Sequence, residues 1–460
     1  MSASGTAPPR PTFAQTIAVY LQPRVLIVMF LGFASGLPLA LSGSTLLFWM
    51  REVGVDLGTI GLFALVGTPY TIKFLWAPMV DALNVPVLSR LLGRRRGWLI
   101  FAQLLLLAAI AFLGTRNPAA SAWGVALAAF LVAVAAATQD IVIDAFRVES
   151  LPEREQAAGM AAFVAAYRVG TLASTVGALL LVSAFEAYGF SRPSAWTASY
   201  IVMALLVVVG MVTALIATEP ENSATAGATP MEGRSIARVW NTALGAFSDF
   251  LSRDAAFVVL VFIVLFKFTD ALAGVMTAPF VVDLGFTRNE YAAIIKGVGL
   301  AATLIGGFAG GYVAWVYPLV TSLWIGGILQ ALANLAFSWQ AVVGHDIWWL
   351  TFAIVLENFT SAIGTVIFVA YLSALCRNPL HTATQFALLT ALAAVGRTYL
   401  SSGAGYLAEQ TGWATFFALC AIAAIPSLLL LAWLQARGHF RALAAEKEAS
   451  VASKSPIQQH

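Results

Sequence analysis

The sequence predicts an all-α integral membrane protein whose twelve transmembrane helices form two bundles of six. Hydrophobic residues make up 60% of the 460 residues and charged residues only 10%, whereas soluble proteins carry about 25% charged residues. Twelve apolar stretches come close to the roughly 20 residues that cross a bilayer core, and a polar segment separates the sixth from the seventh. This composition excludes a soluble enzyme, a nucleic-acid binder and a disordered scaffold.

The twelve apolar stretches follow one another with mostly short polar breaks. The first follows Arg24 directly and is longer than the apolar core of a signal peptide, so we expect a retained helix. The predicted spans are 25–48, 57–80, 97–114, 121–144, 157–185, 197–217, 255–282, 290–314, 319–340, 347–376, 382–408 and 412–435.

These spans define five regions of the chain. We expect an N-terminal tail, an N-terminal bundle, a central loop, a C-terminal bundle and a C-terminal tail, over 1–24, 25–217, 218–254, 255–435 and 436–460. Within the central loop, Ser235–Phe250 alternates polar and apolar residues at roughly helical spacing. This segment is either a short helix on the membrane surface or a linker.

The distribution of lysine and arginine predicts the orientation. If the N-terminus is cytoplasmic, 16 of the 25 basic residues fall on the cytoplasmic side and four on the other side, and five lie within helices. Cytoplasmic loops carry an excess of Lys and Arg, so we expect both termini to be cytoplasmic.

Two short patterns recur between the halves of the chain. Residues 40–43, Ala-Leu-Ser-Gly, correspond to residues 271–274, Ala-Leu-Ala-Gly, at an offset of 231, and Arg168 corresponds to Arg397 at an offset of 229. Many transporters are built from such internal repeats. Two parallel six-helix repeats are the architecture of the major facilitator superfamily.

Charged residues inside the predicted helices are the first candidates for function, because each costs about 2.5–3.5 kcal/mol to insert. Lys267 and Asp270 lie three residues apart and therefore share one helix face. They are either a substrate or proton site between the two bundles or a self-neutralising structural pair.

Glu357 and Asn358 lie near the middle of the tenth predicted helix, with no basic residue on the same helix. Glu357 could exchange a proton during transport, or it could form an ion pair with Arg397 or Lys267 from another helix. Gln330 and Asn334 in the ninth helix add amide groups that could bind substrate.

The fourth helix ends in a polar stripe. Asp140, Asp144 and Arg147 are spaced i, i+4 and i+7, directly after Gln139. We interpret Asp144 and Arg147 as a charge latch at the cytoplasmic side. Asp140 either belongs to that latch or lines the cavity, within reach of Arg168.

A second cluster follows the second helix. Lys73 lies in that helix, Asp81 ends it, and Arg94, Arg95 and Arg96 precede the third helix. A carboxylate and an arginine cluster between helices two and three resemble, loosely, the gating loop of the facilitator superfamily. The arginines could also anchor the loop beside anionic lipid.

No motif for an enzyme or a cofactor appears. The P-loop, nucleophile-elbow and HExxH patterns are missing, and the four histidines lie at or beyond helix ends, so we expect no metal, no cofactor and no catalysis. The two cysteines lie in apolar stretches, which does not suit a disulfide framework.

Taken together, several motifs resemble the AmpG-type muropeptide permeases of the major facilitator superfamily. They are Leu31-Gly-Phe-Ala-Ser-Gly-Leu-Pro-Leu-Ala40, Lys73-Phe-Leu-Trp-Ala-Pro78, Arg94-Arg-Arg-Gly-Trp98, Gln139-Asp-Ile-Val-Ile-Asp-Ala145, Lys267 with Asp270, Gly326-Gly-Ile-Leu-Gln330, Glu357-Asn358 and Ala383-Thr-Gln-Phe-Ala-Leu-Leu389 with Gly396-Arg397.

The resemblance implies a proton-driven importer in the inner membrane of a Gram-negative bacterium. Its substrates would be N-acetylglucosaminyl-1,6-anhydro-N-acetylmuramic acid and its peptide-bearing forms, taken up for peptidoglycan recycling and linked to β-lactamase induction. We expect a monomer. A transporter of another solute, such as acetyl-CoA or an exported drug or peptide, stays open, as does a receptor without transport.

Overall fold

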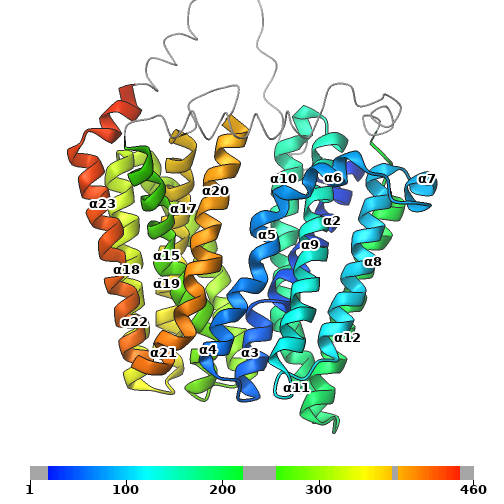
Figure 1. Ribbon diagram of the computed structural model, residues 1–460, viewed down its shortest axis with the longest axis horizontal. Coiled ribbons are helices and arrows are strands. Elements are labelled where there is room, and N and C mark those ends of the chain that lie inside the picture. Colours follow the sequence, from blue (N-terminus) through cyan, green and yellow to red (C-terminus); the bar gives the residue numbers. More distant parts are fainter. Residues whose placement is uncertain (1–18, 221–254, 376–381, 446–460) are drawn as a thin grey trace, which may run out of the picture.

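The computed structural model describes residues 19–220, 255–375 and 382–445. The segment 235–250, for which the sequence left a surface helix and a linker as alternatives, lies outside these residues. The described chain is helical, with no strand within those ranges, and its helices stand side by side in two groups (Figure 1). The helices of the N-terminal half form one group and those of the C-terminal half the other, as predicted.

Each of the twelve predicted spans corresponds to a helix or a run of consecutive helices. In the N-terminal half these are α2 (Pro23–Leu41) with α3 (Ser44–Glu52), α4 (Leu57–Leu62) through α5 (Thr68–Ile72) to α6 (Ala77–Ala82), α8 (Arg94–Gly114), α9 (Ala122–Ser150), α10 (Glu153–Leu172) with α11 (Ala178–Ala187), and α12 (Arg192–Ile216). In the C-terminal half they are α15 (Ala256–Asp283), α16 (Arg288–Tyr291) with α17 (Gly299–Val316), α18 (Leu319–Val343), α19 (Ile347–Leu375), α20 (Thr382–Tyr399) with α21 (Ala404–Thr411), and α22 (Trp413–Ile422) with α23 (Ala424–Ala436).

Eleven of these spans in the described chain are long and apolar enough to cross a membrane. The prediction of a multi-helix membrane protein is therefore confirmed, and the twelve-helix arrangement agrees with it.

Several spans are interrupted where the sequence predicts continuous helices. The first breaks between α2 and α3, where Gly43 adopts φ −118° and ψ −115°. Pro38 lies in the last turn of α2 and accepts a hydrogen bond from the Ser42 N–H at 3.1 Å. Irregular backbone inside a membrane is tolerated where it lines a cavity, so this break marks a place to look for a site.

Two further spans contain a π-helical segment. One joins α10 to α11 over Ala173–Gly177, and the other joins α16 to α17 over Ala292–Val298. Such π-turns occur frequently at functional sites.

The two faces of the molecule differ in how the bundles meet. We call the upper face in Figure 1, where α2 begins and α23 ends, the terminal face, and the lower face the opposite face. Near the opposite face one apolar core runs through both halves, and the rings of Phe48 and Tyr291 lie 4.8 Å apart across the interface. The bundles are therefore closed against each other at that face.

Candidate transport site

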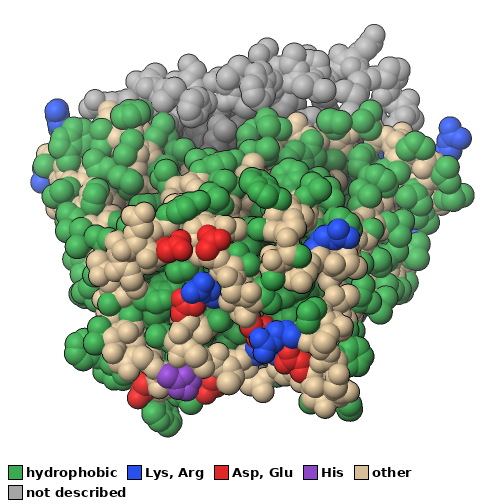
Figure 2. Space-filling model, turned by 60° about the horizontal axis from the view of Figure 1, so that its bottom comes forward, with side chains coloured by type: hydrophobic (Ala, Val, Ile, Leu, Met, Phe, Trp, Pro, Cys, Tyr) green, Lys and Arg blue, Asp and Glu red, His purple; other side chains and the backbone are tan. Residues whose placement is uncertain are grey.

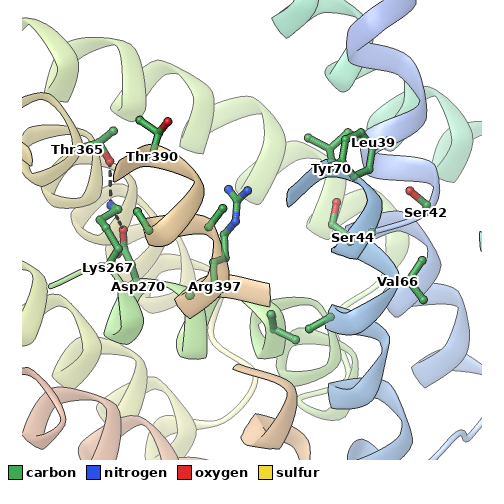
Figure 3. A pocket seen from close by; sticks show the side chains of 18 of the residues that line it. Leu39, Ser42, Ser44, Val66, Tyr70, Lys267, Asp270, Thr365, Thr390 and Arg397 are labelled. Carbon is green, nitrogen blue, oxygen red and sulfur yellow. Dashed lines mark hydrogen bonds and ion pairs between the residues drawn. The ribbon is translucent and has the colours of Figure 1, made fainter. Parts of the chain in front are cut away.

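A cavity of about 670 Å³ lies between the two bundles. Its polar lining comes from both halves, with Ser42 and Ser44 at the helix break on one side and Lys267, Asp270 and Arg397 on the other (Figure 3). Both glycines of the repeated motif, Gly43 and Gly274, line it. The remaining lining is Leu39, Leu47, Phe63, Ala64, Val66, Gly67, Tyr70, Ala271, Val275, Thr365, Phe368, Val369, Leu372, Thr390, Ala393 and Ala394.

Lys267 and Asp270 form the pair that their spacing predicts. The Lys267 Nζ lies 2.7 Å from Asp270 Oδ2 and also donates to Thr365 Oγ1 at 3.0 Å. Asp270 Oδ2 accepts two more hydrogen bonds, from Ser361 Oγ at 2.8 Å and Gln330 Nε2 at 3.2 Å. Three donors from α15, α18 and α19 thus hold one carboxylate at the cavity wall.

A glycine makes room for this network. A Cβ at position 364 would lie 2.6 Å from Gln330 Nε2 and 2.8 Å from its Cδ, so any side chain there would displace the Gln330 amide. The Asn334 amide donates to the Gln330 backbone oxygen at 3.2 Å. Gln330 therefore belongs to the predicted site directly, and Asn334 supports it from the next turn.

A second cavity of about 240 Å³ shares Ser44, Leu47 and Gly274 with the first and therefore adjoins it. Arg168, Glu357 and Asn358 line it, as does Ile295 of the π-helical segment before α17. The predicted reach of Arg168 to Asp140 is not observed: Asp140 accepts a hydrogen bond from Ser35 at 2.6 Å, and Arg168 faces this cavity.

Hydrogen bonds of the Asn358 side chain hold the part of the second cavity wall that α19 forms. It donates to Glu357 Oε2 at 2.9 Å and to the Ile354 carbonyl at 3.0 Å, and its own oxygen accepts from Thr303 at 3.1 Å. Among the described residues, no ion pair joins Glu357 to Lys267 or Arg397. Glu357 and Lys267 therefore lie in separate parts of the site.

The polar stripe on α9 supports the cavity wall from behind. Gln139 Nε2 donates to the Ala34 carbonyl at 3.1 Å, and the Ser35–Asp140 bond joins α2 to α9 in the same place. These contacts hold α2, whose last turn lines the cavity. Lys73 Nζ lies 4.0 Å from Asp144, which also lies 3.6 Å from Arg147.

The predicted gating arginines make contacts within the N-terminal bundle. Arg95 Nε donates to Glu149 at 3.0 Å, and Arg96 Nε donates to the Ala214 carbonyl at 2.9 Å. Arg94 begins α8, and Glu219 caps that helix by accepting from the backbone N–H groups of Arg95 and Arg96. The Asp81 side chain lies outside the described part of the structure. A gating role for these residues stays a prediction.

The structure adds an ion-pair cluster at the opposite face that sequence reasoning missed. Arg51 is paired with Asp283, and Arg288 lies 2.7 Å from Glu52 and 2.5 Å from Glu186. Arg51, Glu52 and Glu186 belong to the N-terminal bundle and the other two to the C-terminal bundle. Acidic and basic side chains accordingly gather across the middle of this face (Figure 2). These ion pairs stabilise the contact between the two bundles at this face.

Glycines bring two helices of different bundles into contact at the same face. A Cβ on Gly405 in α21 would lie 1.7 Å from the Leu57 carbonyl oxygen in α4, and one on Gly61 would lie 2.7 Å from the Gly405 nitrogen. Small residues allow membrane helices to approach this closely. Ion pairs and close backbone packing together close the opposite face.

Weak sequence signals pointed to some of these missed residues. Glu52 and Asp283 are separated by 231 residues, the offset of the repeat, and both belong to the ion-pair cluster. Glu357, Ser361 and Thr365 are spaced four residues apart on a mostly apolar helix, and the last two contact the Asp270–Lys267 pair.

Comparison with known proteins agrees with this geometry. The family model of the Major Facilitator Superfamily matches residues 28–341. The solved structure of a POT family transporter in complex with a thioalcohol-conjugated peptide is similar in fold, with a TM-score of 0.66 at 12% identity, over 90% of this chain and 96% of that one. The xylose transporter XylE from E. coli, in an inward-open conformation, gives a TM-score of 0.61 at 11% identity, over 88% and 94%.

Similarity to curated proteins is stronger and extends along nearly the whole chain. The anhydromuropeptide permease of Escherichia coli K12 is 39% identical over 91% of this chain and 81% of its own length. The putative transporter AmpG 4 of Rickettsia conorii is 33% identical over 91% and 98%. These relatives are transporters, in agreement with a membrane transport function. The chain belongs to the AmpG-type muropeptide permease family of the major facilitator superfamily.

Proposed function

We propose that this protein imports N-acetylglucosaminyl-1,6-anhydro-N-acetylmuramic acid and its peptide-bearing forms from periplasm to cytoplasm, driven by protons, for peptidoglycan recycling. By supplying these muropeptides it would also feed the induction of β-lactamase. The observation that carries the proposal is the 39% identity to an anhydromuropeptide permease, in a chain with a polar cavity between its two bundles.

The cavity suits a glycan with peptide and acid groups. Its volume of about 670 Å³ lies within the roughly 300–1,000 Å³ of small-molecule sites. The Lys267, Asp270 and Gln330 network offers hydrogen-bonding groups, and Phe63, Tyr70 and Phe368 offer apolar ring faces beside them. Sugar rings and N-acetyl groups require such polar and apolar contacts side by side.

The terminal face would be the cytoplasmic face of the bacterial inner membrane. The excess of lysine and arginine on the segments at that face supports this orientation. The bundles are tied together at the opposite face by Arg51–Asp283 and Arg288–Glu186. The structure would then represent the state closed to the periplasm. Rocking of the two bundles would close the terminal face and open the other.

Proton coupling would use a carboxylate of the site. Glu357 lines the second cavity, and Asp270 holds Lys267 at the first. Protonation of either would remove a negative charge from the interface between the bundles. We assign the exchanging proton to Glu357, whose carboxylate lines the smaller cavity between the bundles, and a positioning role to Asp270, which orients Lys267 and Gln330.

Uptake of labelled anhydro-disaccharide into oriented membrane vesicles, with and without an imposed pH gradient, tests the proposal. We expect accumulation that requires an acidic periplasmic side, and the Glu357→Gln variant should lose the dependence on the gradient. Uptake that ignores the gradient would exclude proton symport. Movement only out of the cytoplasm would identify an exporter, and no transport of the disaccharide would exclude the substrate.

A further inference from the structure

The two arginines at the offset of 229 residues differ from the other charged residues of the site. Among the described residues, neither the Arg168 nor the Arg397 guanidinium makes a hydrogen bond or an ion pair, and both side chains are exposed. Lys267, by contrast, is bonded to Asp270 and Thr365. An unpaired arginine in a transmembrane helix is costly unless it meets water or a ligand.

Both arginines face the cavity system, one from each bundle. Arg397 on α20 lines the larger cavity, and its side chain is directed into the space between the C-terminal helices and Tyr70 and Ser44 of the other bundle (Figure 3). Arg168 on α10 lines the smaller cavity. The two cavities share the lining residues Ser44, Leu47 and Gly274, so the two cations lie in neighbouring parts of the interface between the bundles.

The charge balance of the cavities favours an anion. The Lys267–Asp270 pair is neutral within itself, which leaves Arg397 as the excess charge of the larger cavity. Arg168 shares the smaller cavity with Glu357, whose carboxylate accepts from Asn358. Arginine presents a planar fork of donors that matches a carboxylate.

We infer that Arg168 and Arg397 together form a carboxylate-binding site for the transported substrate, one arginine from each bundle. This inference rests on the proposed function, and it assigns the acid group of the muropeptide, the lactyl or a peptide carboxylate, to these two residues. A carboxylate that contacts both guanidinium groups bridges the bundles.

The same arrangement couples binding to the movement of the bundles. Two cations on opposite bundles repel each other, and the repulsion grows as the bundles approach and so opposes closure at the terminal face. A bound carboxylate offsets this repulsion, so the loaded protein closes more easily than the empty one. A neutral substrate analogue cannot have this effect.

Equilibrium binding of two ligands to the purified full-length protein tests the site. The ligands are the labelled anhydro-disaccharide with its free lactyl carboxylate and the same disaccharide with that group converted to a primary amide. The Arg168→Gln and Arg397→Gln variants should bind the acid about 10- to 100-fold more weakly, with affinity for the amide changed less than threefold. Arg168→Lys and Arg397→Lys should fall between wild type and the glutamine variants, because lysine keeps the charge without the fork.

The Arg116→Gln variant is the matched control. Arg116 is exposed and contacts Thr115 and the Phe112 ring, away from both cavities, so its variant should bind both ligands like wild type. Equal losses of acid and amide binding in the glutamine variants, or no loss of either, would overturn the carboxylate site while leaving the proposed substrate in place. Failure of wild type to bind either ligand would overturn both.

Discussion

Arg51 and Asp283 are bonded across the interface between the two bundles, with Arg51 Nη2 donating to Asp283 Oδ2 at 2.8 Å. The same carboxylate oxygen accepts from the Trp413 indole N–H at 3.0 Å. This contact joins the end of α3 to the end of α15 at the opposite face. Together with the Arg288 cluster it stabilises the conformation in which that face is closed.

The Asp283→Asn variant should shift the population toward the state open at the opposite face. The pair is partly exposed, with side-chain exposures of 24% and 20%, so its loss is worth about 1 kcal/mol, or a roughly fivefold change in the ratio of states. Spin labels at Tyr188→Cys and Trp348→Cys, both highly exposed positions at this face, would report the shift as a larger long-distance fraction. The native cysteines are first replaced by alanine. An unchanged distance distribution would contradict the assigned role of the pair.

Loss of Arg288 should destabilise the closed opposite face more than loss of the Arg51–Asp283 pair. Its side chain is only 9% exposed and bridges Glu52 and Glu186 while lying over the Trp196 ring. The Arg288→Gln variant removes the cation that contacts Glu52 and leaves Glu186 with only its longer contact to Arg192. This loss costs about 3 kcal/mol, so the opposite face should open in most molecules. Arg192→Gln is the control, because Arg192 is 55% exposed and 3.4 Å from Glu186. Equal effects of the two variants in the spin-label measurement would argue against the bridging role.

Gly405→Ala should open the same face by a different mechanism. The added methyl group would lie 1.7 Å from the Leu57 carbonyl oxygen, which forces α4 and α21 apart. Gly403→Ala is a matched control two residues away, because a Cβ there meets nothing within 4 Å. Accessibility of a cysteine placed at Leu57 to a membrane-impermeant thiol reagent, in the cysteine-free background, should rise for Gly405→Ala alone. Identical accessibility in both variants would be inconsistent with glycine-dependent closure.

Gly364→Ala should weaken substrate binding although no polar residue of the site is substituted. The methyl group would displace the Gln330 amide and remove its hydrogen bond to Asp270, a loss of about 1 kcal/mol. We expect a roughly fivefold rise in Kd for the anhydro-disaccharide, with little change in Tm. Gly307→Ala serves for comparison, because a Cβ at Gly307 has open space around it. Unchanged affinity in Gly364→Ala would remove Gln330 from the binding network.

The sequence sufficed to predict the helices and one pair within the site, because both depend on local properties. Apolar length identifies the spans, and the three-residue spacing of Lys267 and Asp270 places them on one helix face, where they bond at 2.7 Å. Contacts between helices depend on how each helix is rotated and tilted against its neighbours, which spacing does not encode. For that reason the contact that Arg168 could make with Asp140 is not observed, and the partners of Arg288 could not be predicted.

The roles of individual glycines also could not be predicted from the sequence, because they depend on contacts between helices. Gly364 and Gly405 are two of 37 glycines in the chain, and nothing in their local sequence separates them from glycines that face open space. Only the packing of α18 against α19, and of α4 against α21, gives them their roles.

The central claim is that substrate binds in the cavity between the bundles, and Gly274 allows the most direct test. It lines both parts of the cavity, and a Cβ there meets nothing within 4 Å, so Gly274→Trp would fill the space without a clash in the backbone. Gly311→Trp is the control, because Gly311 also has room for a side chain and is exposed away from both cavities. Equilibrium binding of labelled anhydro-disaccharide should be abolished in Gly274→Trp and retained in Gly311→Trp and wild type. Wild-type affinity in a folded Gly274→Trp variant would contradict the account.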